Sequence, residues 1–137
     1  MEPDVHLFAR AVARLNRRLR QERQSDLTPT QLSTLGTLGT LGPSTPGQIA
    51  AHERIQPPSV TRTLNCLIDL GLVTREPHPD DGRQVVVALS ERGQGMLTAE
   101  RERRDAWLHA HLEALTAQER RTLRDATDIM EKLVDAE

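Results

Sequence analysis

Aromatic residues are almost missing from this sequence, which holds one Phe, one Trp and no Tyr. Proteins that hold single-stranded nucleic acid stack its bases on aromatic rings, and Phe8 and Trp107 are too few to form such a surface. Cysteine is equally scarce. Cys66 is the single thiol, so no intramolecular disulfide can form, and this indicates a reducing compartment.

Long apolar runs are missing as well. No run approaches the roughly 20 residues that a membrane-spanning helix needs, and the first four residues include acidic side chains where a signal peptide carries basic ones. We therefore expect a cytoplasmic protein with no membrane partner. The chain has 137 residues, a length that favours a single domain, 1–137, with a modest core.

The sequence also lacks an excess of positive charge. The 18 basic residues are outnumbered by 20 acidic ones and the net charge is −2, so the overall charge gives no general affinity for nucleic acid. Every basic residue except Lys132 is an arginine, whose planar guanidinium group suits phosphate and guanine. Binding to DNA would therefore depend on where a few arginines are placed.

Residues 4–23 have the apolar period of a helix, with hydrophobic side chains three and four positions apart. A second helix is predicted from Thr28, an N-cap residue followed by proline. It contains the triplet Thr-Leu-Gly repeated over 34–42, which we interpret as a slippage repeat. Gly36 and Gly39 should each weaken the helix by about 1 kcal/mol relative to alanine, so alanine at both positions should stabilise it, provided that neither glycine is required for close packing.

The next segment predicts a helix-turn-helix. Thr45 and the proline after it open a short helix that runs to about Glu53. A turn over 54–56 follows, and a second helix over 59–70 ends before a glycine. Two short helices joined by a tight turn are the helix-turn-helix arrangement, although this turn lacks the glycine often found there.

Beyond this pair of helices the apolar period changes to that of strands. Strands are predicted over 73–76 and 84–89, with a turn-rich tip over 78–82 between them. Two further helices are predicted, one over about 91–114 and one that Thr116 opens with a capping box. The fold class is therefore mainly α with a small β-hairpin wing (α+β): a winged helix-turn-helix with a helical dimerisation region.

The terminal helices predict a homodimer. The segments 4–24 and 91–135 are amphipathic, whereas the winged helix-turn-helix lobe, 27–90, has a small core of its own. The apolar faces of the terminal helices need a partner, and a second copy supplies one by symmetry. Two recognition helices one DNA turn apart read a palindrome, so we expect a pseudo-palindromic operator in double-stranded DNA.

The helix over 59–70 is the candidate recognition helix. Its apolar residues share one face and should pack inward, while small polar side chains and Arg62 lie on the other face near its N-terminal end. Such a helix can enter the major groove and reach base edges. The outward residues are Ser59, Arg62, Thr63 and Cys66.

Three residues of the wing could also meet DNA. Arg83 follows Asp81 by two positions at the wing tip, and an arginine on a projecting hairpin can enter a narrow minor groove. Asp81 could brace its guanidinium group. Arg75, at the base of the wing, could contact phosphate. The alternatives are a surface ion pair between Asp81 and Arg83, worth less than about 1 kcal/mol, and a solvated Arg75.

Several runs of this sequence resemble the MarR family. They are Thr45-Pro-Gly-Gln-Ile-Ala-Ala, Pro57-Pro-Ser-Val-Thr-Arg, Leu67-Ile-Asp-Leu-Gly-Leu-Val-Thr-Arg and, as the most specific, the Asp-x-Arg wing followed by Leu-Ser-x-x-Gly. The resemblance covers nearly the whole chain. It implies an obligate dimer that acts as a transcriptional repressor, released by a small lipophilic or aromatic ligand bound between the dimer region and the DNA-binding lobe.

The same resemblance implies where DNA is contacted. It places minor-groove contact at Arg83 and departs from the family at Gly82, where a second arginine often stands. It places base contacts near Ser59, Thr61, Arg62 and Thr63.

No enzyme class fits the sequence. It has no recognisable nucleophile–base pair and no phosphate-binding glycine loop, so we expect no catalytic residue and no cofactor. His109 and His111 point to different faces of a predicted helix and make poor joint metal ligands. The competing hypothesis is a winged-helix protein–protein interaction module or anti-regulator that does not bind DNA. The four arginines and five acidic residues of 45–90 favour it.

Overall fold

The computed structural model describes residues 1–136, which form six helices and two strands in the predicted order. The predicted fold class is confirmed, because the chain is mainly helical and carries one two-stranded antiparallel wing. The elements are α1 (Val5–Arg20), α2 (Pro29–Leu41), α3 (Pro46–Glu53), α4 (Pro57–Asp69), β1 (Val73–Pro77), β2 (Val85–Leu89), α5 (Glu91–Glu113) and α6 (Ala117–Asp135).

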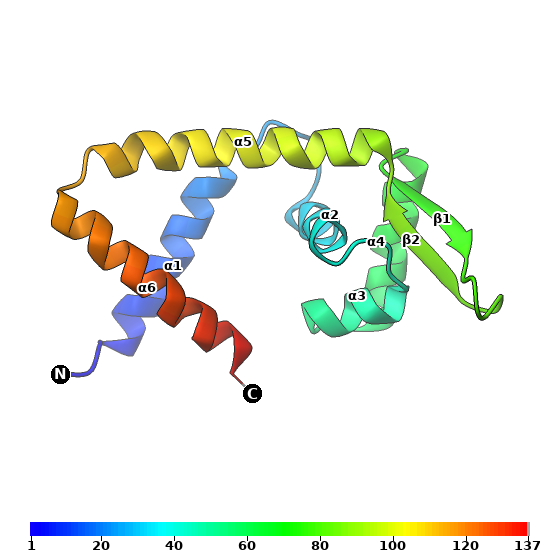
Figure 1. Ribbon diagram of the computed structural model, residues 1–137, viewed down its shortest axis with the longest axis horizontal. Coiled ribbons are helices and arrows are strands. Elements are labelled where there is room, and N and C mark those ends of the chain that lie inside the picture. The colour runs from blue at the N-terminus through cyan, green and yellow to red at the C-terminus, as the bar shows by residue number, and fades with distance from the viewer. Residues whose placement is uncertain (137) are drawn as a thin grey trace.

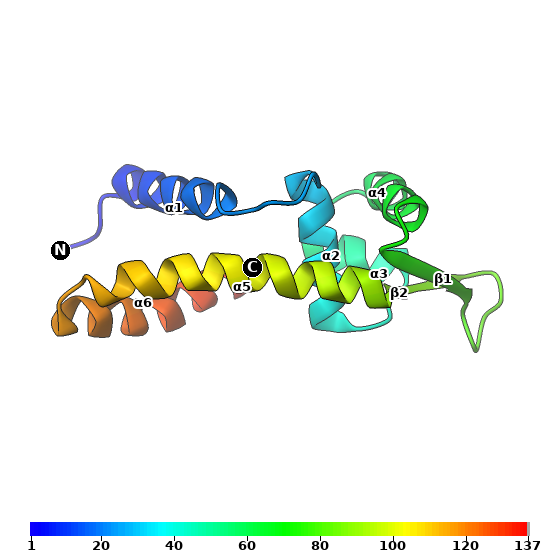
Figure 2. The same ribbon diagram turned by 90° about the horizontal axis from the view of Figure 1, so that it is seen from above.

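Helix α5 runs the length of the molecule and separates two groups of elements (Figure 1). Helices α2, α3 and α4 and the wing lie along its N-terminal half. Helices α1 and α6 lie along its C-terminal half, with α6 turning back beneath α5 (Figure 2). The wing projects beyond the N-terminal end of α5, so its tip is the part of the molecule farthest from α1 and α6.

Side-chain caps begin four of the helices at predicted positions. Thr28, Thr45 and Thr116 each accept a hydrogen bond from the backbone N–H three residues on, and the Gln or Glu there accepts one in return. Ser90 accepts the corresponding bond at the start of α5. These bonds satisfy backbone donors that the first turn of a helix leaves unpaired.

Several predicted boundaries are wrong by one to three residues. Helix α1 ends at Arg20 and not at residue 23. Helix α4 begins at Pro57 and not at Ser59, because proline fits a first turn in which no N–H donor is needed. Strand β2 begins at Val85, because the N–H of residue 84 donates to the Asp81 carbonyl at 3.0 Å in the turn.

The core lies between α2, α3, α4 and the wing. Leu35, Ile49 and Leu67 are completely buried there, one from each helix. Helix α5 adds Leu97, which is 4% exposed, to the same cluster. The core of the lobe that we expected over 27–90 is therefore completed by the first turns of α5.

The two glycines inside α2 have different surroundings. A Cβ at Gly36 would meet no atom within 4 Å, whereas a Cβ at Gly39 would lie 2.7 Å from Leu97 Cδ2 and 3.3 Å from the Arg101 guanidinium group. Gly39 therefore lets α2 and α5 approach closely. Stabilisation by alanine at both positions was expected on the condition that neither glycine is required for close packing, and the surroundings of Gly39 do not meet this condition.

Helices α1 and α6 have no completely buried residue. Their apolar side chains are exposed at the helical spacing that the sequence predicts, and Leu133 is 59% exposed. Within residues 1–136 these apolar faces have no complete covering. They include Val5, Leu7, Phe8, Val12 and Leu15 on α1, and Leu123, Ile129, Met130, Leu133 and Val134 on α6.

Candidate nucleic-acid interface

The turn between α3 and α4 depends on a left-handed residue. Arg54 has φ 56° and ψ 43°, a conformation in which glycine is favoured because a Cβ is strained there. The N–H of Ile55 donates to the Ala50 carbonyl at 3.1 Å and closes α3. The tight turn therefore forms without a glycine, and Arg54 adopts the strained left-handed conformation instead.

Glu53, the last residue of α3, joins this turn to α2. Its carboxylate accepts hydrogen bonds from the hydroxyl groups of Ser33 at 2.9 Å, Thr37 at 3.2 Å and Thr34 at 3.4 Å. A carboxylate at a helix C-terminus is disfavoured by the helix dipole, and these donors offset that cost. Two threonines of the Thr-Leu-Gly repeat thus attach the C-terminal end of α3 to α2, a role that was not predicted from the sequence.

The N-terminal half of α4 is exposed on the predicted face. Ser59, Thr61 and Arg62 are exposed, and Cys66 is exposed farther along the helix. Thr63 is half-buried, and its hydroxyl donates to the Ser59 carbonyl at 3.1 Å. Its donor is therefore engaged within the helix, and its oxygen remains an acceptor. The predicted inward face is confirmed at Val60, Leu64 and Leu67, which are buried.

Arg75 of β1 lies beside α4, close to two polar residues of that helix. Together with Thr61 and Asn65 it lines a small hollow of about 50 Å³ between the helix and the wing. Asn65 is exposed one turn beyond Thr61, and its amide has the donor and acceptor that adenine requires. The sequence analysis missed Asn65, although its position four residues after Thr61 places both on one helix face.

The wing tip is ordered by two side chains that accept backbone hydrogen bonds. His78 Nδ1 accepts from the N–H groups of Asp80 and Asp81, both at 3.1 Å. Asp81 Oδ1 accepts from the Arg83 N–H at 3.1 Å and from Arg83 Nε at 3.3 Å. The contact between Asp81 and Arg83 is therefore present, as both the bracing and the surface ion pair considered from the sequence require. The Arg83 side chain is 93% exposed, so its guanidinium group projects from the tip.

The C-terminal end of α4 is fixed to the start of α5. The residues that follow α4 accept hydrogen bonds from the start of α5. The Leu70 carbonyl accepts one from the Arg92 guanidinium group at 3.2 Å, and the Leu72 carbonyl accepts one from the Ser90 N–H at 2.9 Å. The Ser90 hydroxyl also donates to the Gly71 carbonyl at 2.6 Å. Helix α4 is thus held at one end by α5 and at the other by the Arg54 turn.

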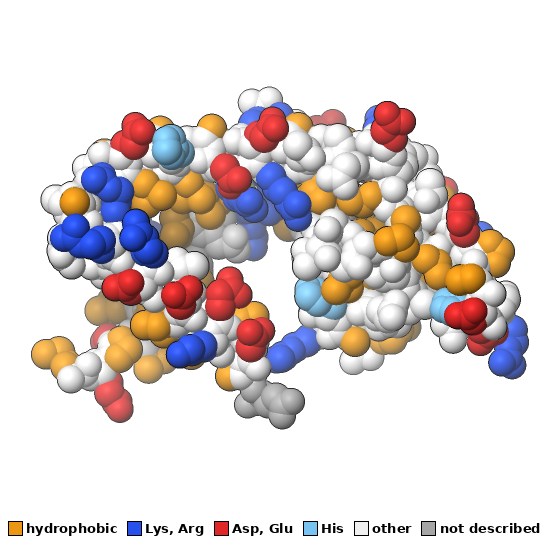
Figure 3. Space-filling model, viewed as in Figure 1, with side chains coloured by type: hydrophobic (Ala, Val, Ile, Leu, Met, Phe, Trp, Pro, Cys, Tyr) orange, Lys and Arg blue, Asp and Glu red, His pale blue; other side chains and the backbone are white. Residues whose placement is uncertain are grey.

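Positive charge on this interface is sparse. The exposed basic residues along α4 and the wing are Arg62, Arg75 and Arg83. Figure 3 shows basic and acidic side chains next to one another at the end of the wing, where Asp80 and Asp81 precede Arg83. Electrostatic attraction to phosphate would therefore come from a few separate guanidinium groups and not from a broad basic surface.

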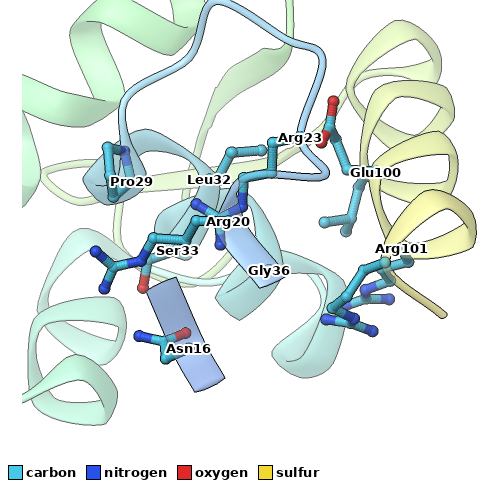
Figure 4. Close-up of a pocket in the computed structure, with 11 residues that line it drawn as sticks. Asn16, Arg20, Arg23, Pro29, Leu32, Ser33, Gly36, Glu100 and Arg101 are labelled. Atoms are coloured by element: carbon cyan, nitrogen blue, oxygen red, sulfur yellow. The ribbon is translucent and has the colours of Figure 1, made fainter. Parts of the chain in front are cut away.

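A larger hollow of about 350 Å³ lies between α1, α2 and α5 (Figure 4). It stands between the terminal helices and the winged lobe, where the family resemblance implies a ligand. Its lining combines the apolar side chains of Pro29, Leu32 and Leu97 with polar ones. Among the polar residues are Arg20, Arg23, Arg101 and Arg104 and the buried Glu100.

Within residues 1–136, no three His, Cys, Asp or Glu side chains are grouped so that they could hold a metal ion. In the same described part of the chain, no helix has the length and apolar character required to cross a membrane.

The sequence matches the profile of the MarR family over residues 27–85. An HTH-type transcriptional regulator of Mycobacterium tuberculosis is 48% identical over 126 residues, which cover 91% of this chain and 88% of that protein. Among solved structures, a putative transcriptional regulator from Pseudomonas aeruginosa is 34% identical with a TM-score of 0.81, over 96% of this chain and 93% of that one. The apo form of wild-type MarR from E. coli is 25% identical with a TM-score of 0.80, over 95% and 98%.

Proposed function

The chain belongs to the MarR family of winged helix-turn-helix transcriptional regulators, and from this premise we propose that it is a homodimeric repressor of a pseudo-palindromic operator, released by a small ligand. Regulators of this family bind DNA and are not enzymes. The DNA-contacting residues, the dimer, repression and the ligand are parts of this proposal. Because its target is chromosomal DNA, we place it in the cytoplasm.

The observation that carries the DNA proposal is the exposed face of α4 between two fixed ends. A recognition helix must present side chains to base edges without losing its orientation. Helix α4 presents Ser59, Thr61, Arg62 and Asn65 to solvent, while its buried face and both termini are held by the lobe. Thr63 would contribute its oxygen as an acceptor.

The wing supports the DNA-binding proposal because its tip could contact the minor groove while α4 occupies the major groove. Arg83 projects from the tip with its guanidinium group free on the outer side, and Asp81 limits its conformations. We propose that Arg83 enters the minor groove or contacts the backbone beside it, and that Arg75 contacts phosphate between the helix and the wing. Both roles require few charges, in agreement with the sparse positive charge of the lobe.

The exposed apolar faces of α1 and α6 support the homodimer. Exposed apolar side chains recur along both helices, and a contiguous apolar surface of this kind is characteristic of a protein interface. We propose that 4–24 and 91–135 form the dimer region with a second copy of the chain. A two-fold dimer would present two α4 helices to successive major grooves.

Titration of DNA variants tests the proposal. The DNA is the segment upstream of the protein's own gene, measured at two salt concentrations. Arg62→Ala should lose about 1–3 kcal/mol of binding free energy and relax sequence preference at one position per half-site. Arg83→Ala should weaken binding more evenly over sequences and reduce the salt dependence. Asp81→Ala should give a milder form of the same loss.

Arg121→Ala is the matched control, because this arginine is exposed on α6, where it donates to Gln118 one turn away. It should leave DNA binding unchanged. If the parent protein binds no operator fragment, or if Arg62→Ala and Arg83→Ala bind every site as tightly as the parent does, the DNA proposal fails. The interaction-module hypothesis, which the five acidic residues of 45–90 favour, would then replace it.

A further inference from the structure

The hollow between α1, α2 and α5 holds more positive charge than its lining neutralises. Figure 4 shows Arg20 and Arg23 reaching it from the α1 side and Arg101 from α5, and Arg104 lines it as well. Arg104 pairs with Asp105 at 3.0 Å. Arg20, Arg23 and Arg101 form no ion pair with any acidic side chain of residues 1–136. Three guanidinium groups therefore line the hollow without a direct ion-pair partner among residues 1–136.

The one carboxylate in the lining is already engaged. Glu100 is 6% exposed, and its Oε1 accepts from the Ser25 N–H at 3.0 Å and from the guanidinium group of Arg103, which does not line the hollow. Its Oε2 is buried and has no hydrogen-bond partner among residues 1–136. Glu100 thus leaves most of the positive charge uncompensated and offers one buried acceptor to a donor.

The arginines also repel one another. Partial burial and the neighbouring charge of Arg20 lower the pKa of Arg23, Arg104 lowers it further, and Glu100 offsets part of the effect. Helix α2 lines the hollow along one face, with Pro29, Leu32, Ser33 and Gly36, and adds no acidic side chain to it. An anion in the hollow would relieve this repulsion.

Resting on the proposed ligand-responsive function, we propose that the effector of this protein is a small hydroxylated polyanion bound among Arg20, Arg23 and Arg101. At least two negative charges are required, since a monoanion would neutralise one guanidinium group and leave the others repelling. The hydroxyl group supplies the donor that Glu100 Oε2 lacks. A volume of about 350 Å³ suits a small molecule, and phosphorylated polyols and hydroxylated polycarboxylic acids are the chemical classes that fit.

Three probes separate these requirements. Citrate carries three carboxylates and a hydroxyl group, tricarballylate is the same skeleton without the hydroxyl group, and benzoate is an aromatic monoanion. Binding to the full-length protein is measured by calorimetry and by thermal unfolding, without DNA and at equal ionic strength, because exposed charges are screened by salt. We expect citrate to bind most tightly, tricarballylate more weakly and benzoate most weakly of the three.

Two variants and a control assign the binding to the hollow. Arg23→Gln and Arg101→Gln should each weaken citrate binding about tenfold or more, the equivalent of one charge-assisted hydrogen bond. Arg121→Gln, which changes an exposed arginine of α6, should bind citrate as the parent does. Without citrate, Arg23→Gln should unfold at the same or a higher temperature than the parent, because it removes a repelling charge. A loss of binding in that variant is therefore not a loss of folding.

The proposal is overturned if benzoate binds as tightly as citrate, if none of the probes binds, or if Arg23→Gln and Arg121→Gln bind citrate equally. A parallel titration with operator DNA keeps the two proposals apart. If the protein binds DNA but no polyanion, only the polyanion proposal is refuted. If it binds citrate through Arg23 and Arg101 but binds no DNA, the polyanion site is supported and the repressor proposal is refuted.

Discussion

Replacing Gly39 by alanine should destabilise this protein, although alanine is the better helix former. The new Cβ would lie 2.7 Å from Leu97 Cδ2, and Leu97 is 4% exposed, so that side chain must leave a packed position. Overpacking a core costs about 1–3 kcal/mol, and the gain of about 1 kcal/mol in helix propensity offsets part of it. We expect the free energy of unfolding to fall by up to about 2 kcal/mol.

Gly36→Ala is the matched control in the same helix. Its Cβ would meet no atom within 4 Å, so only the propensity gain remains, and the free energy of unfolding should rise by about 1 kcal/mol. Thermal and denaturant unfolding followed by circular dichroism measure both changes. All variants are compared at one protein concentration, because the Tm of a dimer depends on concentration.

Leu97→Ala tests whether the clash is the cause. In that background Gly39→Ala should be stabilising, because the atom it would strike is gone, and the double-mutant cycle should give a coupling energy of about 1–3 kcal/mol. If Gly39→Ala raises the stability of the parent protein as much as Gly36→Ala does, the reasoning is refuted, and α2 and α5 do not approach as closely as described.

Four other changes test separate features. Arg54→Gly should raise the free energy of unfolding by about 1 kcal/mol, because glycine adopts the left-handed turn without strain; a lower stability would show that the Arg54 side chain contributes more than the strain costs. Glu53→Ala should cost about 2 kcal/mol by removing a charged acceptor from the α2 hydroxyl groups, and Glu53→Gln should cost less, since its amide oxygen still accepts. Leu133→Asp should shift sedimentation toward the monomer and weaken DNA binding indirectly; a stable monomer of the parent chain would contradict this. Hydrogen bonds from Thr116 lower the pKa of Glu119, so its contribution is present above the unfolded pKa and lost as the pH falls. Glu119→Gln should therefore be less stable than the parent at pH 7, and this difference should shrink in acid.

The sequence predicts the elements that short-range chemistry determines. Thr28, Thr45 and Thr116 start helices because their side chains and the residue three positions later satisfy the backbone locally. The outward face of α4 follows in the same way from the helical period. The order of the elements and the candidate DNA-contacting residues other than Asn65 therefore come from the sequence alone.

Contacts between segments that are far apart in the sequence cannot be predicted in this way. Gly39 meets α5 and Glu53 meets α2 across the fold, and neither contact leaves a periodic signal. The hollow with four arginines joins Arg20 and Arg23 to Arg101 and Arg104, and these two pairs lie in segments that are far apart in the sequence and have no visible relation there. The left-handed Arg54 was missed for a different reason, because a side chain other than glycine gives no indication of a positive φ.

The attachment of α4 to the first turn of α5 makes the recognition helix and α5 move as one rigid body. Helix α5 has 23 residues, which at 1.5 Å per residue is a length of about 35 Å. A tilt of about 5° at its far end would displace α4 by about 3 Å, close to the rise of about 3.4 Å per base pair. In the proposed dimer, a small rotation among α1, α5 and α6 would thus change the separation of the two α4 helices by a distance comparable to the rise of one base pair. Operators with altered half-site spacing should therefore select different tilts of α5.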